Sequence, residues 1–134
     1  MTPRTRQTLN ATLVAASLSS AINVLLFSFF THKSWLNPML KTGENESVQE
    51  LTAMGILIAS TLPIVVGSLI YLLLVKYTNN PKWIYWTMAL LMMFLSFINP
   101  FMIPGVEIST AISLNIMHIV CAVGSAFFLT RWVD

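Results

Sequence analysis

Four long apolar stretches, with almost all charged residues placed between or beyond them, constrain what this chain can fold into more than any other feature. The stretches cover about residues 9–30, 51–75, 83–103 and 109–130. A helix of roughly 20 mostly apolar residues crosses the hydrocarbon core of a bilayer, which is about 30 Å thick. Only 9% of the 134 residues are charged, against about 25% in a soluble domain. The chain therefore lacks the polar surface of a soluble protein, and the sequence predicts four membrane-spanning helices.

The short connections between these stretches predict how the helices are arranged. The segments 77–82 (YTNNPK) and 103–107 (IPGVE) contain the helix breakers asparagine, proline and glycine. Such short connections make consecutive helices antiparallel neighbours. We therefore expect an all-α fold, an integral membrane four-helix antiparallel bundle, formed by a single transmembrane domain of residues 1–134.

The connection over residues 31–50 is longer and carries four large apolar side chains. They are Trp35, Leu36, Met39 and Leu40. We expect them either to lie on the membrane surface or to cover the end of the bundle. Ser47 and Glu50 have the spacing of a helix capping box, which predicts that these residues lead directly into the second helix.

The first stretch has two interpretations. Arg4 and Arg6 followed by an apolar run and the small residues 19–21 are typical of a cleaved secretory signal. The apolar run continues to Phe30, however, and its length of about 22 residues exceeds that of a signal peptide core. We favour a retained membrane helix.

The distribution of lysine and arginine predicts the orientation in the membrane. One side carries five such residues and the other side carries Lys33 and Lys41. Because short cytoplasmic loops are richer in lysine and arginine, we expect both termini to be cytoplasmic. The five residues on this side are Arg4, Arg6, Lys76, Lys82 and Arg131.

Charge and cysteine content argue against several classes of function. The net charge of +2 is small and there is no basic patch with interleaved aromatic residues, so nucleic acid is not an expected partner. Cys121 is the only cysteine, which rules out a disulfide within the chain and a Cys-x-x-Cys motif. The eight methionines are scattered, so we expect them to pack rather than to bind metal, and we expect no cofactor.

Each predicted helix carries a polar side chain at about the same depth. With a rise of 1.5 Å per residue, six residues come out about 18–24 Å from the predicted cytoplasmic end of their helix. They are Asn23, Ser60, Ser96, Asn99, Asn115 and His118. His118 is the only histidine, acid or base deep in any stretch. We predict that these six residues form one polar layer in the outer half of the bilayer.

Helical spacing also places small and polar residues on one stripe of each helix. Small residues let helix backbones approach closely in lipid, so these stripes are expected to face inward. The stripes are Thr12, Ala16, Ser19 and Asn23; Ser60, Pro63 and Gly67; Tyr85, Met92, Ser96 and Asn99; and Ala111, Asn115, His118, Ala122 and Ser125.

Two prolines predict irregular backbone inside the membrane. Pro63 lacks a backbone donor and frees the carbonyl of Ala59, which needs another partner in lipid. We expect that partner to be Asn23, Asn99 or His118. Pro100 predicts a kink or an unwound turn before the third helix ends.

The polar layer has a structural and a functional interpretation. Polar side chains inside a bundle often hydrogen-bond between helices, and each such contact stabilises by about 0.6 kcal/mol. Alternatively the layer lines a small polar cavity for a ligand or a proton, since intramembrane ionisable residues are often functional. Haem ligation by His118 and a hydrolase pair of His118 with Ser60 or Ser96 have less support, because a second deep histidine and a Gly-x-Ser-x-Gly motif are missing.

Two segments resemble a known family. LSFINPF (95–101) and AISLNIMHIVCAV (111–123) resemble a family of small bacterial four-helix membrane proteins known only as a domain of unknown function. The matching positions are Ser96 with Pro100, and 117–120 (MHIV) with Ala122. The resemblance covers nearly the whole chain. It implies a bacterial inner-membrane protein and gives added weight to His118, but it implies no activity.

These observations favour a non-enzymatic scaffold, accessory subunit or membrane-binding module. The alternative is a small-molecule or lipid binding or transport site in the polar layer around His118, and an enzyme is the third option. The expected partners are the lipid bilayer and either another membrane protein or a second copy of the chain. The sequence leaves open a monomer and a dimer, and a second copy could dock through Ala15 and Ser19 or through Cys121 and Ser125.

Overall fold

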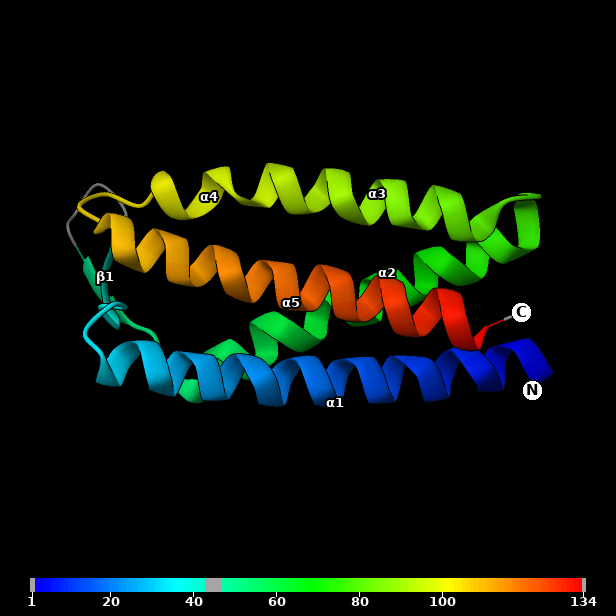
Figure 1. Cartoon of the computed structure of the whole chain (residues 1–134), viewed down its shortest axis with the longest axis horizontal. Helices are drawn as coiled ribbons and strands as arrows, with labels where there is room; N and C mark the ends of the chain where they lie inside the picture. The colour runs from blue at the N-terminus through cyan, green and yellow to red at the C-terminus, as the bar shows by residue number, and fades with distance from the viewer. Residues whose placement is uncertain (1, 43–46, 134) are drawn as a thin grey trace.

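Four segments of the chain form helices that are long and apolar enough to cross a membrane, as the sequence predicts. The structure is a computed structural model and describes residues 2–42 and 47–133. Figure 1 shows the elements in space. They are α1 (Pro3–His32), β1 (Met39–Thr42), β2 (Ser47–Glu50), α2 (Ala53–Tyr77), α3 (Pro81–Ser96), α4 (Ile98–Phe101) and α5 (Ile108–Trp132). The third membrane span consists of α3 and α4 together.

Local sequence signals set where two of the long helices begin. The hydroxyl of Thr2 accepts a hydrogen bond from the backbone N–H of Thr5 at 3.2 Å, and Pro3 occupies the first turn of α1. The hydroxyl of Thr52 accepts from the N–H of Gly55 at 3.1 Å at the start of α2. Each threonine satisfies an amide that has no partner within its own helix. The predicted capping box at Ser47–Glu50 is wrong, because these residues form strand β2 and pair with β1.

The hairpin β1–β2 and the residues before it cover one end of the bundle. The strands are antiparallel, with Met39 opposite Glu50. Leu36 and Leu40 are buried, whereas Trp35 and Met39 are exposed. Two of the large apolar side chains in this connection therefore cover the end of the bundle, as one expectation has it, and the other two face outward. The small hairpin is the one departure from an otherwise helical fold in the described residues.

The four spans do not share the packing equally. α1 packs against α2 and α5, and α3 packs mainly against α5 with a smaller contact to α2. In the described residues α1 and α3 are not in contact. Figure 1 shows α5 between α1 and α3, with α2 crossing behind them. The bundle is thus a three-helix core of α1, α2 and α5, to which the segment α3–α4 is added on one side.

The third span is interrupted near its C-terminal end, as Pro100 predicts. α3 ends at Ser96 and α4 begins at Ile98. Proline lacks a backbone N–H and cannot continue the helical hydrogen-bond pattern. The inward stripe expected for this span is only partly correct, because Tyr85 is buried but Met92 and Asn99 are exposed.

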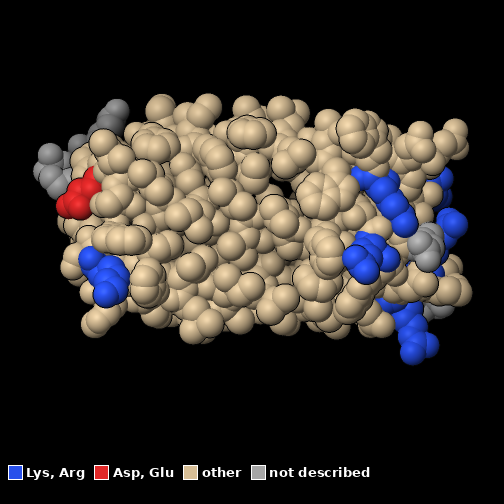
Figure 2. All heavy atoms as spheres, in the orientation of Figure 1, with Lys and Arg blue, Asp and Glu red and all other residues tan. Residues whose placement is uncertain are grey.

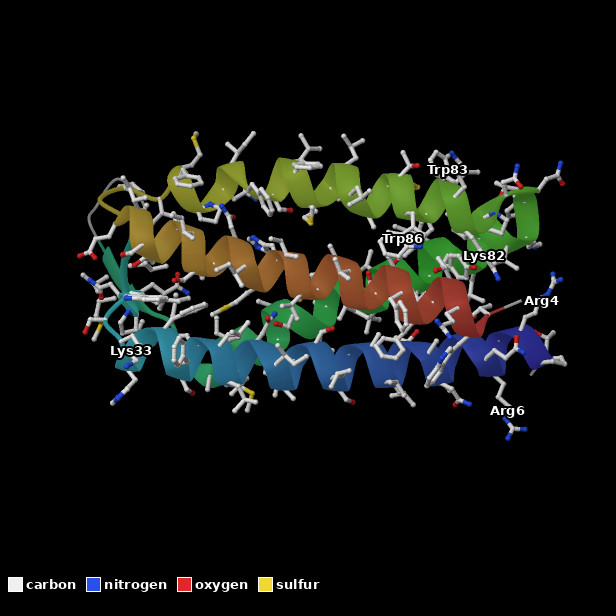
Figure 3. The ribbon with its side chains drawn as sticks, viewed as in Figure 1. Arg4, Arg6, Lys33, Lys82, Trp83 and Trp86 are labelled. Carbon is white, nitrogen blue, oxygen red and sulfur yellow. The ribbon has the colours of Figure 1, made fainter. Side chains whose placement is uncertain are left out.

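The charged residues gather at the two ends of the molecule. Both termini lie at the same end (Figure 1), as an even number of spans requires. Figure 2 shows most of the visible lysine and arginine side chains at this end. In Figure 3, Arg4, Arg6 and Lys82 lie there together with Trp83, and Lys33 lies at the opposite end. The structure thus places an uninterrupted apolar belt between two charged ends, which is the pattern of a multi-pass membrane protein.

Candidate functional site

A buried hydrogen-bond cluster joins the three core helices at Asn23. This asparagine on α1 is 1% exposed. Its Nδ2 lies 2.9 Å from the Ser60 hydroxyl on α2, 3.1 Å from the Met117 carbonyl on α5 and 3.2 Å from Cys121 Sγ. An amide nitrogen has two hydrogens, so it can serve two of these acceptors fully. Asn23 and Ser60 are therefore brought together, as the sequence predicts, at the junction of three helices.

Cys121 belongs to this cluster, which the sequence did not reveal. Its Sγ lies 3.7 Å from the Ser60 carbonyl, besides its contact with Asn23. The sequence signal for it is weak, because Cys121 follows His118 by about one helical turn but is not part of the stripe that contains His118. A second interhelical hydrogen bond joins the hydroxyls of Ser20 and Thr61 at 2.9 Å.

Small side chains allow α1 to lie directly against α5. Ala11 and Ala15 on α1 are fully buried. A Cβ atom added at Gly124 on α5 would collide with the Ser19 hydroxyl. Ala15, Ser19 and Ser125 are buried inside the bundle, so they are not accessible to a second copy of the chain. In lipid, close approach of small residues supplies much of the packing energy between helices.

Several other buried hydroxyls need no partner from another helix. Thr12 donates to the Thr8 carbonyl at 2.7 Å, and Ser113 donates to the Ser109 carbonyl at 2.8 Å. A hydroxyl that bonds to the preceding turn of its own helix is satisfied without a ligand. These positions are structural, and they differ in this respect from His118.

A cavity of about 320 Å³ lies between α2, α3 and α5. It is partly open, and Figure 2 shows a narrow opening in the surface in the region between α3 and α5. Its walls are mostly apolar, and the residues that matter for its chemistry are Ala89, Met92, Ser96, His118, Ala122 and Ser125. Large side chains on α3 meet small ones on α5 here, and they do not fill the space between the helices.

Tyr85 closes one end of this cavity. Its hydroxyl donates to Ser125 Oγ at 3.4 Å, and its ring packs edge-to-face on Tyr71 with centroids 5.2 Å apart. A Cβ atom added at Gly67 would collide with the Tyr85 hydroxyl. Gly67 therefore leaves the space that this hydroxyl occupies, and the two stripe residues predicted from sequence meet each other here.

His118 and Ser96 lie at the other end of the cavity. His118 comes from α5 and Ser96 from the last turn of α3, and both line the cavity. The Nδ1 atom of His118 is buried and has no hydrogen-bond partner in the described residues. A buried polar atom without a partner is costly and calls for an explanation, such as an unseen ligand or water. His118 is the strongest candidate for a binding residue in this structure.

Asn115 and Asn99 lie outside both groups. Asn115 Nδ2 donates to the Phe97 carbonyl at 3.3 Å, and its Oδ1 is buried without a partner in the described part of the chain. Asn115 thus supports the break between α3 and α4. Asn99 is exposed. In the described residues Asn23, Asn99 and His118 make no hydrogen bond to the Ala59 carbonyl, and Asn23 instead donates to Ser60.

Four of the six residues predicted as one layer are therefore divided between two faces of α5. Asn23 and Ser60 meet on the side of α1, whereas His118 and Ser96 line the cavity on the side of α3. Cys121 contacts Asn23 and also lines the cavity. The sequence predicts only the depth of a residue along the membrane. The two groups are separate because their side chains lie on different sides of α5. Ser60 is hydrogen-bonded to Asn23, so the hydrolase pair of Ser60 with His118 is not formed.

Comparison with known proteins gives a family but no activity. No curated protein and no solved structure matches the chain. A family model with the description "Family of unknown function" matches residues 1–133. This finding confirms the resemblance to an uncharacterised family. The chain therefore belongs to the family of unknown function DUF6069.

Proposed function

We propose that this protein is a non-enzymatic membrane protein that binds a small, mainly apolar molecule from the bilayer in the cavity between α2, α3 and α5. The observation that carries this proposal is the cavity itself, whose lining includes His118, a residue with a buried and unpartnered Nδ1. Its volume of about 320 Å³ lies at the lower end of the range for ligand pockets. Apolar walls with a few polar groups are typical of such sites.

The cluster around Asn23 favours a structural role instead. Its donor is supplied with acceptors from α2 and α5, and Asn23 is almost completely buried. A ligand would have to separate α1 from the two other core helices to reach it. The cluster is therefore best explained as interhelical hydrogen bonding, while the cavity is the better candidate for binding.

A second candidate function is that of a scaffold or accessory subunit. The third span supports this role, because only 11% of its 18-residue apolar segment is buried inside the bundle. Lipid or another membrane protein can cover the remaining surface. This role and ligand binding are distinguishable by what remains attached to the protein after gentle extraction.

The experiment is native mass spectrometry of the protein extracted from its own membranes, compared with two variants. Ala122→Leu places a larger side chain in the cavity, and Ala21→Leu adds the same atoms on the exposed face of α1. A small bound mass that is kept in Ala21→Leu and lost in Ala122→Leu supports the binding proposal. A stoichiometric protein partner supports the accessory role, and a bare chain contradicts the binding proposal.

We also propose that the protein lies in a bacterial inner membrane with both termini in the cytoplasm. The excess of lysine and arginine at the end that holds both termini supports this orientation. Gln7 and Gln49 are both exposed and lie at opposite ends. In a Cys121→Ser background, an impermeant maleimide should label Gln49→Cys in intact cells and Gln7→Cys only after permeabilisation. The reverse pattern would overturn the orientation.

A further inference from the structure

We infer that the cavity takes an uncharged, single-chain amphiphile whose hydroxyl or carbonyl group hydrogen-bonds to His118 and Ser96, with its apolar chain directed toward Tyr85. This inference rests on the proposed binding function and adds the chemical class of the ligand. Three features of the cavity carry it: the absence of charge in its lining, the uneven distribution of free polar groups, and its size.

The lining offers no partner for an ionic headgroup. No Asp, Glu, Lys or Arg is among the residues that line the cavity in the described part of the chain. A charge inside the bilayer costs several kcal/mol unless an opposite charge or water meets it. Sulfates, carboxylates and ammonium groups are therefore disfavoured, whereas a hydroxyl or a carbonyl needs only a hydrogen bond.

The free polar groups lie at one end of the cavity. At the Tyr85 end, the tyrosine donates to Ser125 and Ser125 donates to the Ala122 carbonyl at 3.1 Å, so both hydroxyl hydrogens are used. At the opposite end, the side chains of His118 and Ser96 both line the cavity, and neither makes a hydrogen bond within the described residues. A ligand hydroxyl placed between α3 and α5 at this end can bond to both side chains. A hydroxyl group both donates and accepts, and a neutral imidazole has one donor nitrogen and one acceptor nitrogen.

The remaining wall fits one flexible apolar chain. Met88, Met92 and Met93 line it together with Ala89, and methionine adapts its shape to irregular apolar ligands. Eleven residues separate Tyr85 from Ser96, which corresponds to about 16 Å along α3. Together with the volume of about 320 Å³, this length suits a single chain and is too small for a lipid with two acyl chains.

Access from the bilayer agrees with an amphiphile as ligand. The opening between α3 and α5 (Figure 2) lies between the charged ends of the molecule, within the apolar belt. α3 buries only Tyr85, and the third span is interrupted after Ser96. A molecule dissolved in the membrane can therefore reach the cavity without crossing water.

The test uses three brominated amphiphiles with the same chain: bromodecanol, bromodecyl sulfate and bromodecyl-trimethylammonium. The full chain is placed in phosphatidylcholine nanodiscs, with Trp35, Trp83 and Trp132 replaced by phenylalanine. The remaining Trp86 packs against the cluster that contains Tyr85. Because bromine quenches tryptophan at short range, a chain end bound near Tyr85 quenches Trp86. Titrations are compared at equal concentrations of probe in the bilayer.

We expect saturable quenching by bromodecanol that disappears in Ala122→Leu and persists in Ala21→Leu. His118→Leu and Ser96→Ala should each weaken binding by about tenfold, which corresponds to about 1.4 kcal/mol. His118→Gln keeps a hydrogen-bonding side chain and should lose no more than about threefold. Circular dichroism of each variant shows whether its helices are intact, and His118→Gln keeps the test informative if His118→Leu fails to fold.

Three contrary outcomes have different meanings. Saturable binding of the sulfate or the ammonium probe with the affinity of the alcohol would overturn the assignment of ligand class and leave the binding function intact. Equal binding of the alcohol by His118→Leu, His118→Gln and the wild-type chain would overturn the role of His118 in the same way. No saturable quenching by any probe, or quenching that persists in Ala122→Leu, would contradict the proposed binding function itself.

Discussion

The first and third spans both cross the membrane, yet they contribute to the structure in different ways. Of the 18-residue apolar segment of α1, 39% is buried inside the bundle, against 11% of the corresponding segment of the third span. α1 buries nine side chains, and eight of them are alanine, serine, threonine or asparagine. α3 buries only Tyr85, and its exposed side chains include methionine, leucine and phenylalanine.

This difference teaches which side chains hold helices together in lipid. Large apolar residues gain little by leaving lipid for the protein interior, because both surroundings are equally apolar. Small residues permit close backbone approach, and polar residues find hydrogen-bond partners on neighbouring helices. The α1 interface therefore packs closely, whereas the α3 interface leaves the cavity. Both features follow from the fact that lipid is as apolar as the protein interior.

The largest expected effect is at the close contact between α1 and α5. Gly124→Leu places a side chain where even a Cβ would meet the Ser19 hydroxyl. The helices must separate, and we expect a loss of about 3 kcal/mol in the free energy of unfolding. Titration with sodium dodecyl sulfate in mixed micelles, followed by circular dichroism, measures it. A loss below that of Gly67→Leu would break the comparison between the two interfaces.

Removal of the donor at the junction of the core helices should have the next largest effect. Asn23→Leu keeps the approximate volume but leaves the Ser60 hydroxyl and the Met117 carbonyl without their interhelical partner. We expect unfolding free energy to fall by about 1–2 kcal/mol in the same titration. A gain in stability would show that the cluster does not hold the core together.

On the α3 side, an equally crowded glycine should tolerate a side chain better. Gly67→Leu meets the Tyr85 hydroxyl, but the tyrosine ring and the new side chain can move into the cavity that Gly67 borders. We expect a loss of about 1 kcal/mol or less. The same variant should reduce bromodecanol binding, since the cavity becomes smaller. Unchanged binding would place the ligand elsewhere.

The smallest effect is expected at the exposed asparagine of the third span. Asn99 is the counterpart of Asn23 in sequence depth, but it is exposed. Asn99→Leu should change unfolding free energy by no more than about 0.5 kcal/mol, the range of substitutions away from packed or hydrogen-bonded sites. A loss as large as that of Asn23→Leu would mean that an unseen partner covers this position.

Much of the candidate site was predictable, but not its division into two groups. The stripe that contains Thr12, Ala16, Ser19 and Asn23 is buried as predicted, because α1 is a single continuous helix and its periodicity is maintained. The stripe of the third span is only partly buried, because α3 packs mainly against α5 alone. Met92 is exposed within the unbroken helix, and Asn99 is exposed beyond the break at Phe97. A depth estimate cannot detect how many neighbours a helix has. The capping box failed for a similar reason, since pairing with β1 outweighed a local helix signal.

The sequence by itself determined the number of membrane spans, their approximate limits and the location of both chain ends on one side. These properties depend on the thickness of the bilayer and on the need of each backbone group for a hydrogen bond within its own helix, so they are local. Only the tertiary structure decided that Asn23 meets Ser60 and that His118 faces a cavity with Ser96. Those contacts depend on the rotation, crossing and interruption of whole helices, which are set by the fit between side chains far apart in the sequence.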